Sequence, residues 1–361
     1  MTIGIDASRA FQKNKTGIEE YSFQVIKHLC GEFEKEQVIL YCNPAINIRP
    51  DFELPANWKI KFLRAPIFWT QARLSLEMLF RPVDVLFVPA HTVPLIHPKN
   101  TIVTIHGLEY EFCPKAYSFW QRFYMRLVIK NSCRWAKHII AVSENTKKDL
   151  MKLYKVPEGK IGVIYEGIGE ISSNIQYSIS NKIPNTKYLL FVGRLEERKN
   201  ICGIVDAFEI LKEKYKIPHR LILVGKYGHG GENIKNKIYG SDCKHDIILT
   251  GYISDEEKFY LLKSADVFIF ATFYEGFGLP ILEAQSVGTP VVTSNISSMP
   301  EISGNNAILV DPKDVNAIAE AVHKLISDES YKNDIIEKGL ENVKRFSWEK
   351  CAREIADILL K

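Results

Sequence analysis

The chain has 361 residues, of which 46% are hydrophobic and 25% are charged. This length exceeds the usual size of one domain, so we expect two domains. The composition is that of a soluble globular enzyme, and no apolar run is long enough to span a membrane. The first residues lack the basic and apolar regions of a secretion signal, which favours a cytoplasmic protein. Seven cysteines without a C-x-x-C pair indicate neither a zinc site nor a disulfide framework.

Apolar segments alternate with helical patterns along the first half of the chain. Short apolar runs predict strands at residues 3–5, 38–41, 59–63, 85–88, 102–105, 139–142 and 162–164. Apolar residues at helical spacing predict helices at residues 17–30, 72–80, 118–132 and 144–153. This alternation is typical of βαβ units and therefore of a parallel sheet covered by helices.

A stretch without periodicity, residues 168–185, predicts a linker before the alternation resumes. Beyond it, strands are predicted at residues 188–192, 221–224, 247–249, 267–270, 290–293 and 307–310. Helices are predicted at residues 201–215, 255–263, 280–287, 315–327 and 331–345. The fold class is thus α/β, with two doubly wound Rossmann-like domains and a ligand expected in the cleft at the carboxyl ends of the strands.

The run E-G-F-G-L-P-I-L-E places two carboxylates, Glu275 and Glu283, where a predicted strand ends and a predicted helix begins. Gly276 and Gly278 would let a phosphate approach the backbone amides at the helix N-terminus. Glu283 follows Leu279 by four positions, so it can face the same pocket. Carboxylates beside a phosphate cradle suit a nucleotide-sugar. The alternative is that both glutamates are solvated residues at helix ends.

A second run, V-G-R-L-E-E-R-K-N, places Arg194 and Lys199 beyond another predicted strand. Two cations in that position suit a diphosphate leaving group. The alternative is a salt-bridged loop, because Glu196 and Glu197 lie between them. Since the chain contains no Asp-x-Asp, we expect no metal and assign the charge of the diphosphate to these cations and to helix-terminal amides. The run G-K-Y-G-H-G-G from Gly225 predicts a strand-to-helix turn.

Together these runs resemble glycosyltransferase family four, whose members are retaining enzymes of the GT-B fold. The resemblance rests also on G-T-P-V-V from Gly288, A-V-S-E-N-T-K-K-D-L around Ser143, T-G-I-E-E-Y from Thr16, T-I-H-G-L around His106, and F-S-W-E-K near the C-terminus. It implies an acceptor-side domain at residues 1–168, a linker at 169–186, a nucleotide-sugar-binding domain at 187–345, and a C-terminal helix at 346–361 that returns to the first domain.

The resemblance implies a catalytic set of Glu275, Arg194, Lys199 and His106. Glu275 would lie at the sugar ring, and the two cations would stabilise the diphosphate as the glycosidic bond breaks. His106 would face the donor sugar or the acceptor, although a lone histidine is more often a structural residue. The implied donor-binding residues are Gly17, Gly251, Tyr252, Gly276, Phe277, Gly278, Leu279 and Glu283. Among these, Gly17 would approach the phosphates, residues 251–252 the base, and Glu283 the ribose.

Two departures from the family pattern concern the substrates. Gly107 stands where many members have Asp, so that contribution is absent or is supplied by Glu109. The run T-G-I-E-E-Y is similar to the T-G-I-x-R-Y of bacterial polysaccharide mannosyltransferases, which implies GDP-mannose as the donor, but Glu20 replaces the Arg. UDP-glucose or another UDP-hexose therefore stays open. The nucleotide-sugar is a substrate, and no cofactor is expected.

The leading hypothesis is transfer of a hexose, with mannose favoured, to a sugar or lipid-linked acceptor in surface polysaccharide synthesis. A nucleotide-sugar epimerase of the same fold and a non-catalytic nucleotide-sugar-binding subunit are the alternatives. The presence of Glu275, Glu283, Arg194 and Lys199 argues against the binding subunit, because such a protein could lose them freely.

Residues 115–155 hold ten basic and two acidic residues. No nucleic-acid-binding motif accompanies them, so nucleic acid is not expected as a partner. Arg122, Arg126, Lys130 and Arg134 recur at helical spacing and favour peripheral contact with anionic lipid at the inner face of the cell membrane. A solvated basic helix face is the alternative. The apolar residues of the same helix, Trp120, Phe123, Tyr124, Leu127 and Val128, favour packing in the core of the first domain.

Overall fold

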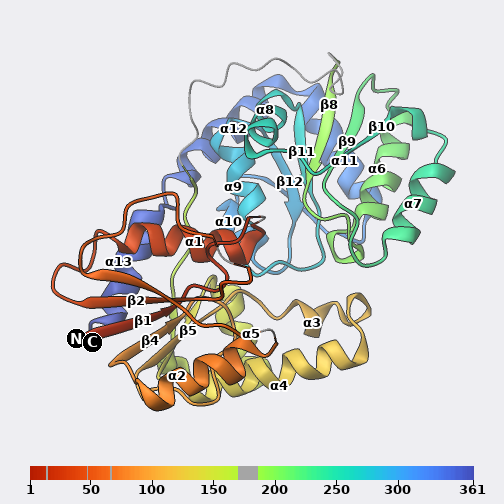
Figure 1. The fold of residues 1–361 in the computed structure, drawn as a ribbon. Coiled ribbons are helices and arrows are strands. Elements are labelled where there is room, and N and C mark those ends of the chain that lie inside the picture. The colour runs from red at the N-terminus through yellow and green to blue at the C-terminus, as the bar shows by residue number, and fades with distance from the viewer. Residues whose placement is uncertain (14, 47, 66, 170–185) are drawn as a thin grey trace. The chain divides into compact units, whose positions relative to one another are not determined.

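The computed structural model describes residues 1–13, 15–46, 48–65, 67–169 and 186–361, which form two compact units (Figure 1). The first unit comprises residues 1–108, 119–167 and 346–361. The second comprises residues 109–118 and 168–345. Almost all of the predicted linker, 169–186, lies outside the described residues.

The first unit contains a seven-stranded parallel sheet in the order β3-β2-β1-β4-β5-β6-β7. Its strands are β1 (Thr2–Asp6), β2 (Gln37–Cys42), β3 (Trp58–Phe62), β4 (Val85–Val88), β5 (Thr101–Ile105), β6 (His138–Ala141) and β7 (Ile161–Val163). Each lies within about one residue of its predicted position, because a strand buried on both faces reads as a continuous apolar run.

Helices pack on both faces of this sheet (Figure 1). They are α1 (Gly17–Leu29), the π-helix η1 (Trp69–Leu74), α2 (Ser75–Phe80), α4 (Phe119–Trp135), α5 (Glu144–Tyr154) and α13 (Trp348–Leu359). A capping box formed by Thr16 and Glu19 starts α1. The C-terminal helix α13 packs against α1, with the rings of Trp348 and Tyr21 5.9 Å apart. The C-terminal helix therefore belongs to the first unit.

The second unit contains a six-stranded parallel sheet in the order β10-β9-β8-β11-β12-β13. Its strands are β8 (Tyr188–Val192), β9 (Arg220–Val224), β10 (Ile247–Gly251), β11 (Val267–Phe270), β12 (Val291–Ser294) and β13 (Ile308–Val310). Its helices are α3 (Glu109–Phe112), α6 (Ile201–Glu213), α7 (Gly231–Gly240), α8 (Asp255–Ser264), α9 (Leu279–Ser286), α10 (Met299–Ser303), α11 (Val315–Ser327) and α12 (Glu329–Val343). The sequence did not predict α3, α7 and α10. Helices α3 and α10 are short, and α7 begins at a glycine, which is a weak helix former.

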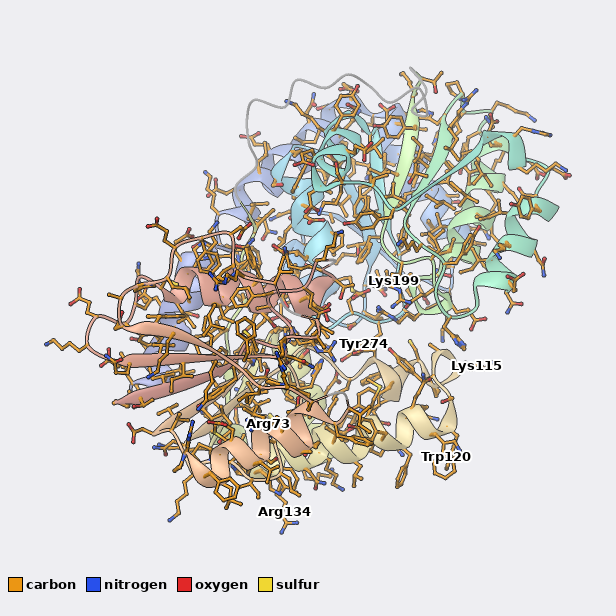
Figure 2. All side chains as sticks on the ribbon, viewed as in Figure 1. Arg73, Lys115, Trp120, Arg134, Lys199 and Tyr274 are labelled. Carbon is orange, nitrogen blue, oxygen red and sulfur yellow. The ribbon has the colours of Figure 1, made fainter. Side chains whose placement is uncertain are left out.

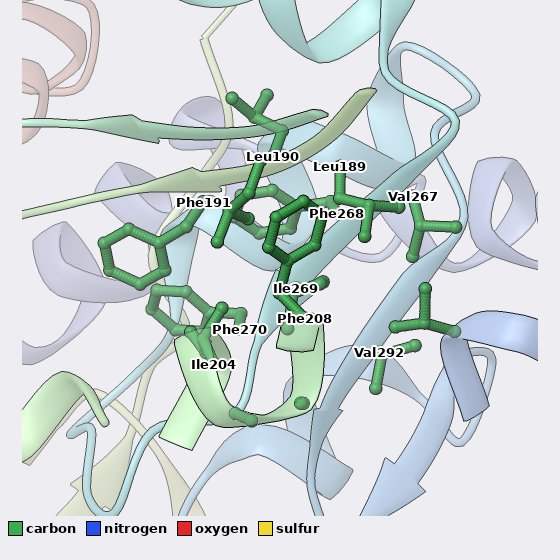
Figure 3. Packing of buried hydrophobic residues seen from close by; sticks show 14 of the residues in the cluster. Leu189, Leu190, Phe191, Ile204, Phe208, Val267, Phe268, Ile269, Phe270 and Val292 are labelled. Carbon is green, nitrogen blue, oxygen red and sulfur yellow. The ribbon is translucent and has the colours of Figure 1, made fainter. Parts of the chain in front are cut away.

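The core of the second unit lies between the central strands and α6 (Figure 3). Phe191 of β8 stacks on Phe270 of β11 with ring centroids 6.0 Å apart, and Phe208 of α6 is fully buried in the same cluster. Stacked rings contribute about 0.5–1.5 kcal/mol beyond their buried area. This packing fixes the two strands whose carboxyl ends carry the predicted site residues.

In each sheet the strand order reverses once, between β1 and β4 in the first unit and between β8 and β11 in the second. Open α/β sheets bind ligands outside the carboxyl ends of the strands at this reversal. The loops that follow β8 and β11 carry V-G-R-L-E-E-R-K-N and E-G-F-G-L-P-I-L-E, so both predicted motifs lie at one reversal point.

Candidate active site

Two basic side chains of the second unit converge on one carboxylate. Lys199 Nζ and Arg198 Nη1 both donate to Oε1 of Glu275, the latter at 3.1 Å. Arg198 Nε also donates to Glu196 Oε2 at 3.0 Å. Figure 2 shows Lys199 and, next to Glu275 in the chain, Tyr274. The structure thus brings together two predicted residues, Lys199 and Glu275, and adds Arg198, which the sequence reasoning missed.

Asn200 holds the two loops together. Its backbone adopts the left-handed conformation, with φ of 58°, between the short turn at Glu197–Lys199 and the start of α6. Its side-chain Nδ2 donates to the carbonyls of Ala271 at 3.0 Å and Pro312 at 2.6 Å. Because Ala271 directly follows β11, these bonds fix the position of Lys199 relative to the loop that carries Glu275.

Two serines after β12 support the backbone of Glu275. The Ser297 hydroxyl donates to the Glu275 carbonyl at 2.6 Å and accepts from the Glu275 amide at 3.3 Å. The Ser298 hydroxyl lies 2.8 Å from the Glu275 carbonyl and 2.5 Å from that of Phe277. Sequence reasoning missed both, although a run of polar residues after a predicted strand was the available signal.

The electrostatics of Lys199 and Glu275 suit an anionic ligand. The side chain of Lys199 is only 9% exposed, and burial and then the neighbouring Arg198 lower the pKa of its amine well below the ordinary value. An incoming diphosphate would favour the protonated form. Oε2 of Glu275 forms no hydrogen bond with any residue that the structure describes, so it can accept one from a sugar hydroxyl.

Arg194 is more exposed than Lys199. Its Nε donates to Oε1 of Glu196 at 2.9 Å, while 62% of its side chain is accessible. The alternative of a salt-bridged loop is therefore correct for Arg194 and Glu196. It does not exclude phosphate binding, because an exposed guanidinium keeps further donors for a second acceptor.

The loop of Gly276 to Leu279 leads into α9 much as predicted. The helix begins at Leu279, and Gly278 before it has a φ of 114°, a conformation that favours glycine. Glu283 lies one turn into α9, where Oε1 accepts from Lys258 of α8 at 2.7 Å. No described residue bonds to its Oε2, which is therefore available to a ribose hydroxyl.

The predicted contacts to the base and to the phosphates stay predictions. Gly251 ends β10 with a φ of 71°, and the exposed ring of Tyr252 follows, with Lys226 Nζ 5.3 Å from its centroid. Gly17 starts α1 in the first unit. A Cβ at Gly17 or Gly251 would meet no atom within 4 Å, so packing inside the chain does not require glycine at either position.

His106 follows β5 in the first unit, and both of its ring nitrogens have partners. Nε2 donates to the Pro89 carbonyl at 2.8 Å, and Nδ1 lies 3.3 Å from Oε1 of Glu166. Its side chain is 8% exposed and lies edge-on to Tyr21, with centroids 4.5 Å apart. Direct contact with a substrate would require one of these hydrogen bonds to break, so the catalytic role stays a prediction.

Residues 109–118 belong to the second unit although they follow β5 of the first in the chain. The ring of Phe112 stacks on Tyr274, with centroids 4.6 Å apart and an interplanar angle of 11°. Burial opposes the charge on Arg198, but Glu109 and then Glu196 outweigh it and raise the pKa of the guanidinium. Glu109 thus acts on the cluster around Glu275, a role that the sequence did not indicate.

Known proteins are similar to this chain in sequence and in fold. Residues 17–169 match the family described as Glycosyltransferase Family 4, and residues 174–342 match that described as Glycosyl transferases group 1. The O-antigen chain mannosyltransferase B of Escherichia coli is 29% identical over 361 residues, covering 94% of each chain. The O-antigen chain mannosyltransferase RfbU of Salmonella typhimurium strain LT2 is 27% identical over 258 residues, covering 72% of this chain and 69% of that one.

The fold likeness extends to a solved structure. The sucrose-phosphate synthase from Thermosynechococcus elongatus superimposes with a TM-score of 0.76, covering 99% of this chain and 98% of that chain at 19% identity. The chain has two Rossmann-like units with parallel sheets, as expected for a glycosyltransferase of the GT-B fold. The family matches and the relatives indicate the same kind of enzyme. The chain therefore belongs to glycosyltransferase family 4, the retaining hexosyltransferases of the GT-B fold.

Proposed function

We propose that this enzyme transfers mannose from GDP-mannose to a hydroxyl of a lipid-linked glycan during surface polysaccharide assembly. The observation that carries the transfer itself is the convergence of Lys199 and Arg198 on Glu275 at the strand reversal of the second sheet. The choice of mannose is supported by the two O-antigen mannosyltransferases among the relatives.

The chemistry follows from these charges. The bond between the anomeric carbon and the diphosphate oxygen breaks, and Arg194 and Lys199 stabilise the negative charge that grows on the diphosphate. Glu275 lies beside the sugar and stabilises the positive charge that develops on its ring. The acceptor oxygen bonds to the same face of the anomeric carbon, and its proton passes to the departing diphosphate.

A panel of nucleotide-sugars tests the proposal. At equal concentrations, GDP-mannose should raise the melting temperature more than UDP-glucose or UDP-galactose, because the ligand that binds more tightly stabilises the folded state more. A ligand at 100 times its Kd stabilises the folded state by about 2.7 kcal/mol. GDP should then be released only when an acceptor glycan is present. Preference for a UDP-sugar would exclude GDP-mannose as the donor but would leave the assignment as a transferase in place. Release of free sugar without acceptor would indicate an epimerase, and binding without release a non-catalytic subunit.

Transfer in this proposal needs no added divalent cation, because Arg194 and Lys199 supply the positive charge. Full activity is expected in excess EDTA. Loss of activity that Mg²⁺ or Mn²⁺ restores would contradict this assignment.

The surface of α4 supports action at a membrane. Trp120 is 74% exposed and Phe123 53% exposed, and Tyr124 and Leu127 on the same side are also exposed. Figure 2 shows Trp120 and Arg134 pointing away from the body of the first unit. Packing of this apolar face in the core was therefore the wrong expectation. Among the described residues no helix is long and apolar enough to cross a bilayer.

The basic side chains of α4 add electrostatic attraction to this apolar surface. Arg126, Lys130 and Arg134 are exposed at intervals of four residues. Each cation near an anionic lipid surface contributes about 1 kcal/mol, while aromatic rings favour the level of the headgroups. We therefore expect peripheral contact with the inner face of the cell membrane, where a lipid-linked acceptor would be found.

Vesicle sedimentation tests this contact. The wild-type protein should bind vesicles containing phosphatidylglycerol at low salt and dissociate as salt rises. A variant with serine at Arg122, Arg126, Lys130 and Arg134 should lose binding. The control replaces Lys244, Lys263, Lys313 and Lys344, which are exposed on the second unit, and alters the net charge equally. Equal loss in both variants, or no binding by the wild type, would favour a soluble acceptor.

A further inference from the structure

The strand reversal of the first sheet carries a histidine in an unusual backbone conformation. His91 follows the end of β4 at Val88 by three residues, beside β1, where open α/β sheets bind ligands. Its φ is 49°, in the left-handed region that only a few per cent of residues other than glycine adopt, with Asn, Asp and His the more frequent among them. Its amide donates to the Thr104 carbonyl at 3.0 Å, which holds the residue in place. Such strain is concentrated at functional sites.

The side chain of His91 is also unsatisfied. Nδ1 is buried and has no hydrogen-bond partner in the part of the chain that the structure describes. The residue as a whole is partly exposed. Burial, then the neighbouring His106, lowers the pKa of His91 well below the ordinary value, so the imidazole is neutral at pH 7. A neutral imidazole has one nitrogen that donates and one that accepts.

The neighbouring His106 differs in this respect. The two rings lie edge-on with centroids 5.2 Å apart, but both nitrogens of His106 already have partners at Pro89 and Glu166. Of the two histidines, His91 therefore has the free hydrogen-bonding capacity.

We propose that the imidazole of His91 hydrogen-bonds to a sugar hydroxyl at the carboxyl edge of the first sheet and is a further substrate-contacting residue of the transferase. The inference rests on the proposed function, since the hydroxyl belongs either to the acceptor glycan or to the hexose of the donor. Hydroxyl groups match both nitrogens of a neutral imidazole, because they donate and accept.

Three substitutions of His91 separate this role from a structural one. Glycine removes the side chain and relieves the backbone strain. Asparagine adopts the left-handed conformation and places an amide near the position of Nδ1, and glutamine places one near Nε2. His91→Gly should keep or raise the melting temperature while kcat/KM for transfer falls about tenfold, the effect of one lost hydrogen bond. Asparagine or glutamine should restore part of the activity and so identify the nitrogen.

Separate titrations identify the source of the hydroxyl. A raised KM for the acceptor with unchanged GDP-mannose affinity assigns it to the acceptor, and weaker GDP-mannose binding with unchanged GDP binding assigns it to the donor hexose. The control is His97→Asn, at a histidine that stacks on Trp135 away from this edge, and it should leave the kinetics unchanged.

Wild-type turnover in the nucleotide-sugar panel tests the proposed function separately. With that turnover measured, wild-type kinetics in both His91→Gly and His91→Asn would overturn the assignment. So would a fall in melting temperature that accounts for the lost activity in all three variants.

Discussion

Glu275 is the residue on which the charges of the candidate site converge, since Arg198 and Lys199 share its Oε1. Glu275→Gln keeps the shape of the side chain but removes the negative charge beside the developing oxocarbenium ion. We expect kcat to fall by about 100-fold or more, with GDP-mannose affinity nearly unchanged, because the lost interaction is strongest in the transition state. Single-turnover assays with a donor titration check this, and near-normal turnover would remove Glu275 from the mechanism.

Lys199 should make nucleotide binding depend on pH. Its protonated amine attracts the diphosphate, and burial lowers its pKa below the ordinary lysine value of about 10.4. GDP affinity should therefore fall as pH rises through this lowered pKa. Lys199→Arg stays charged throughout and should show a flatter profile. Isothermal titration of both proteins with GDP gives the comparison, and parallel curves would mean that another group is responsible.

At the scale of elements, the segment 109–118 connects the first sheet in sequence to the charged cluster of the second unit. The stack of Phe112 on Tyr274 is one contact between this segment and the loop that carries Glu275. Without this contact Glu109 would be held less firmly near Arg198, so the charges around Glu275 would be less well ordered.

Phe112→Ala should weaken this docking by about 1 kcal/mol, the contribution of a stacked pair, which corresponds to a roughly fivefold smaller equilibrium constant for docking. Hydrogen exchange in residues 109–118 should accelerate by a similar factor, because exchange follows the undocked fraction. Phe112→Tyr keeps the ring and should behave as the wild type. Unchanged exchange in the alanine variant would show that other contacts hold the segment.

At the scale of the whole molecule, the C-terminal helix α13 completes a unit whose first strand lies at the other end of the sequence. Trp348 is buried against Tyr21 of α1. Trp348→Ala should lower the free energy of unfolding of the first unit by about 3–5 kcal/mol, because it leaves a cavity. The exposed Leu340 offers a control, and its replacement by alanine should cost less than about 0.5 kcal/mol.

Scanning calorimetry with GDP present distinguishes the two units. The transition that Trp348→Ala lowers should be the one that belongs to the first unit, while the GDP-stabilised transition of the second unit stays in place. If Trp348→Ala lowered only the unfolding temperature of the second unit, the assignment of α13 to the first unit would be contradicted.

The sequence by itself determined the strands and most helices, because parallel strands covered on both faces are apolar runs bounded by turns. It also determined the family, through motifs that follow β8 and β11. Several functional candidates were decided only by the tertiary structure. Arg198 and Glu109 are ordinary charged residues in sequence, and nothing local shows that they meet near Glu275. Likewise, the strain and unpaired nitrogen of His91 appear only once β4 packs beside β1 and β5, because a backbone dihedral and a missing partner are properties of the folded chain.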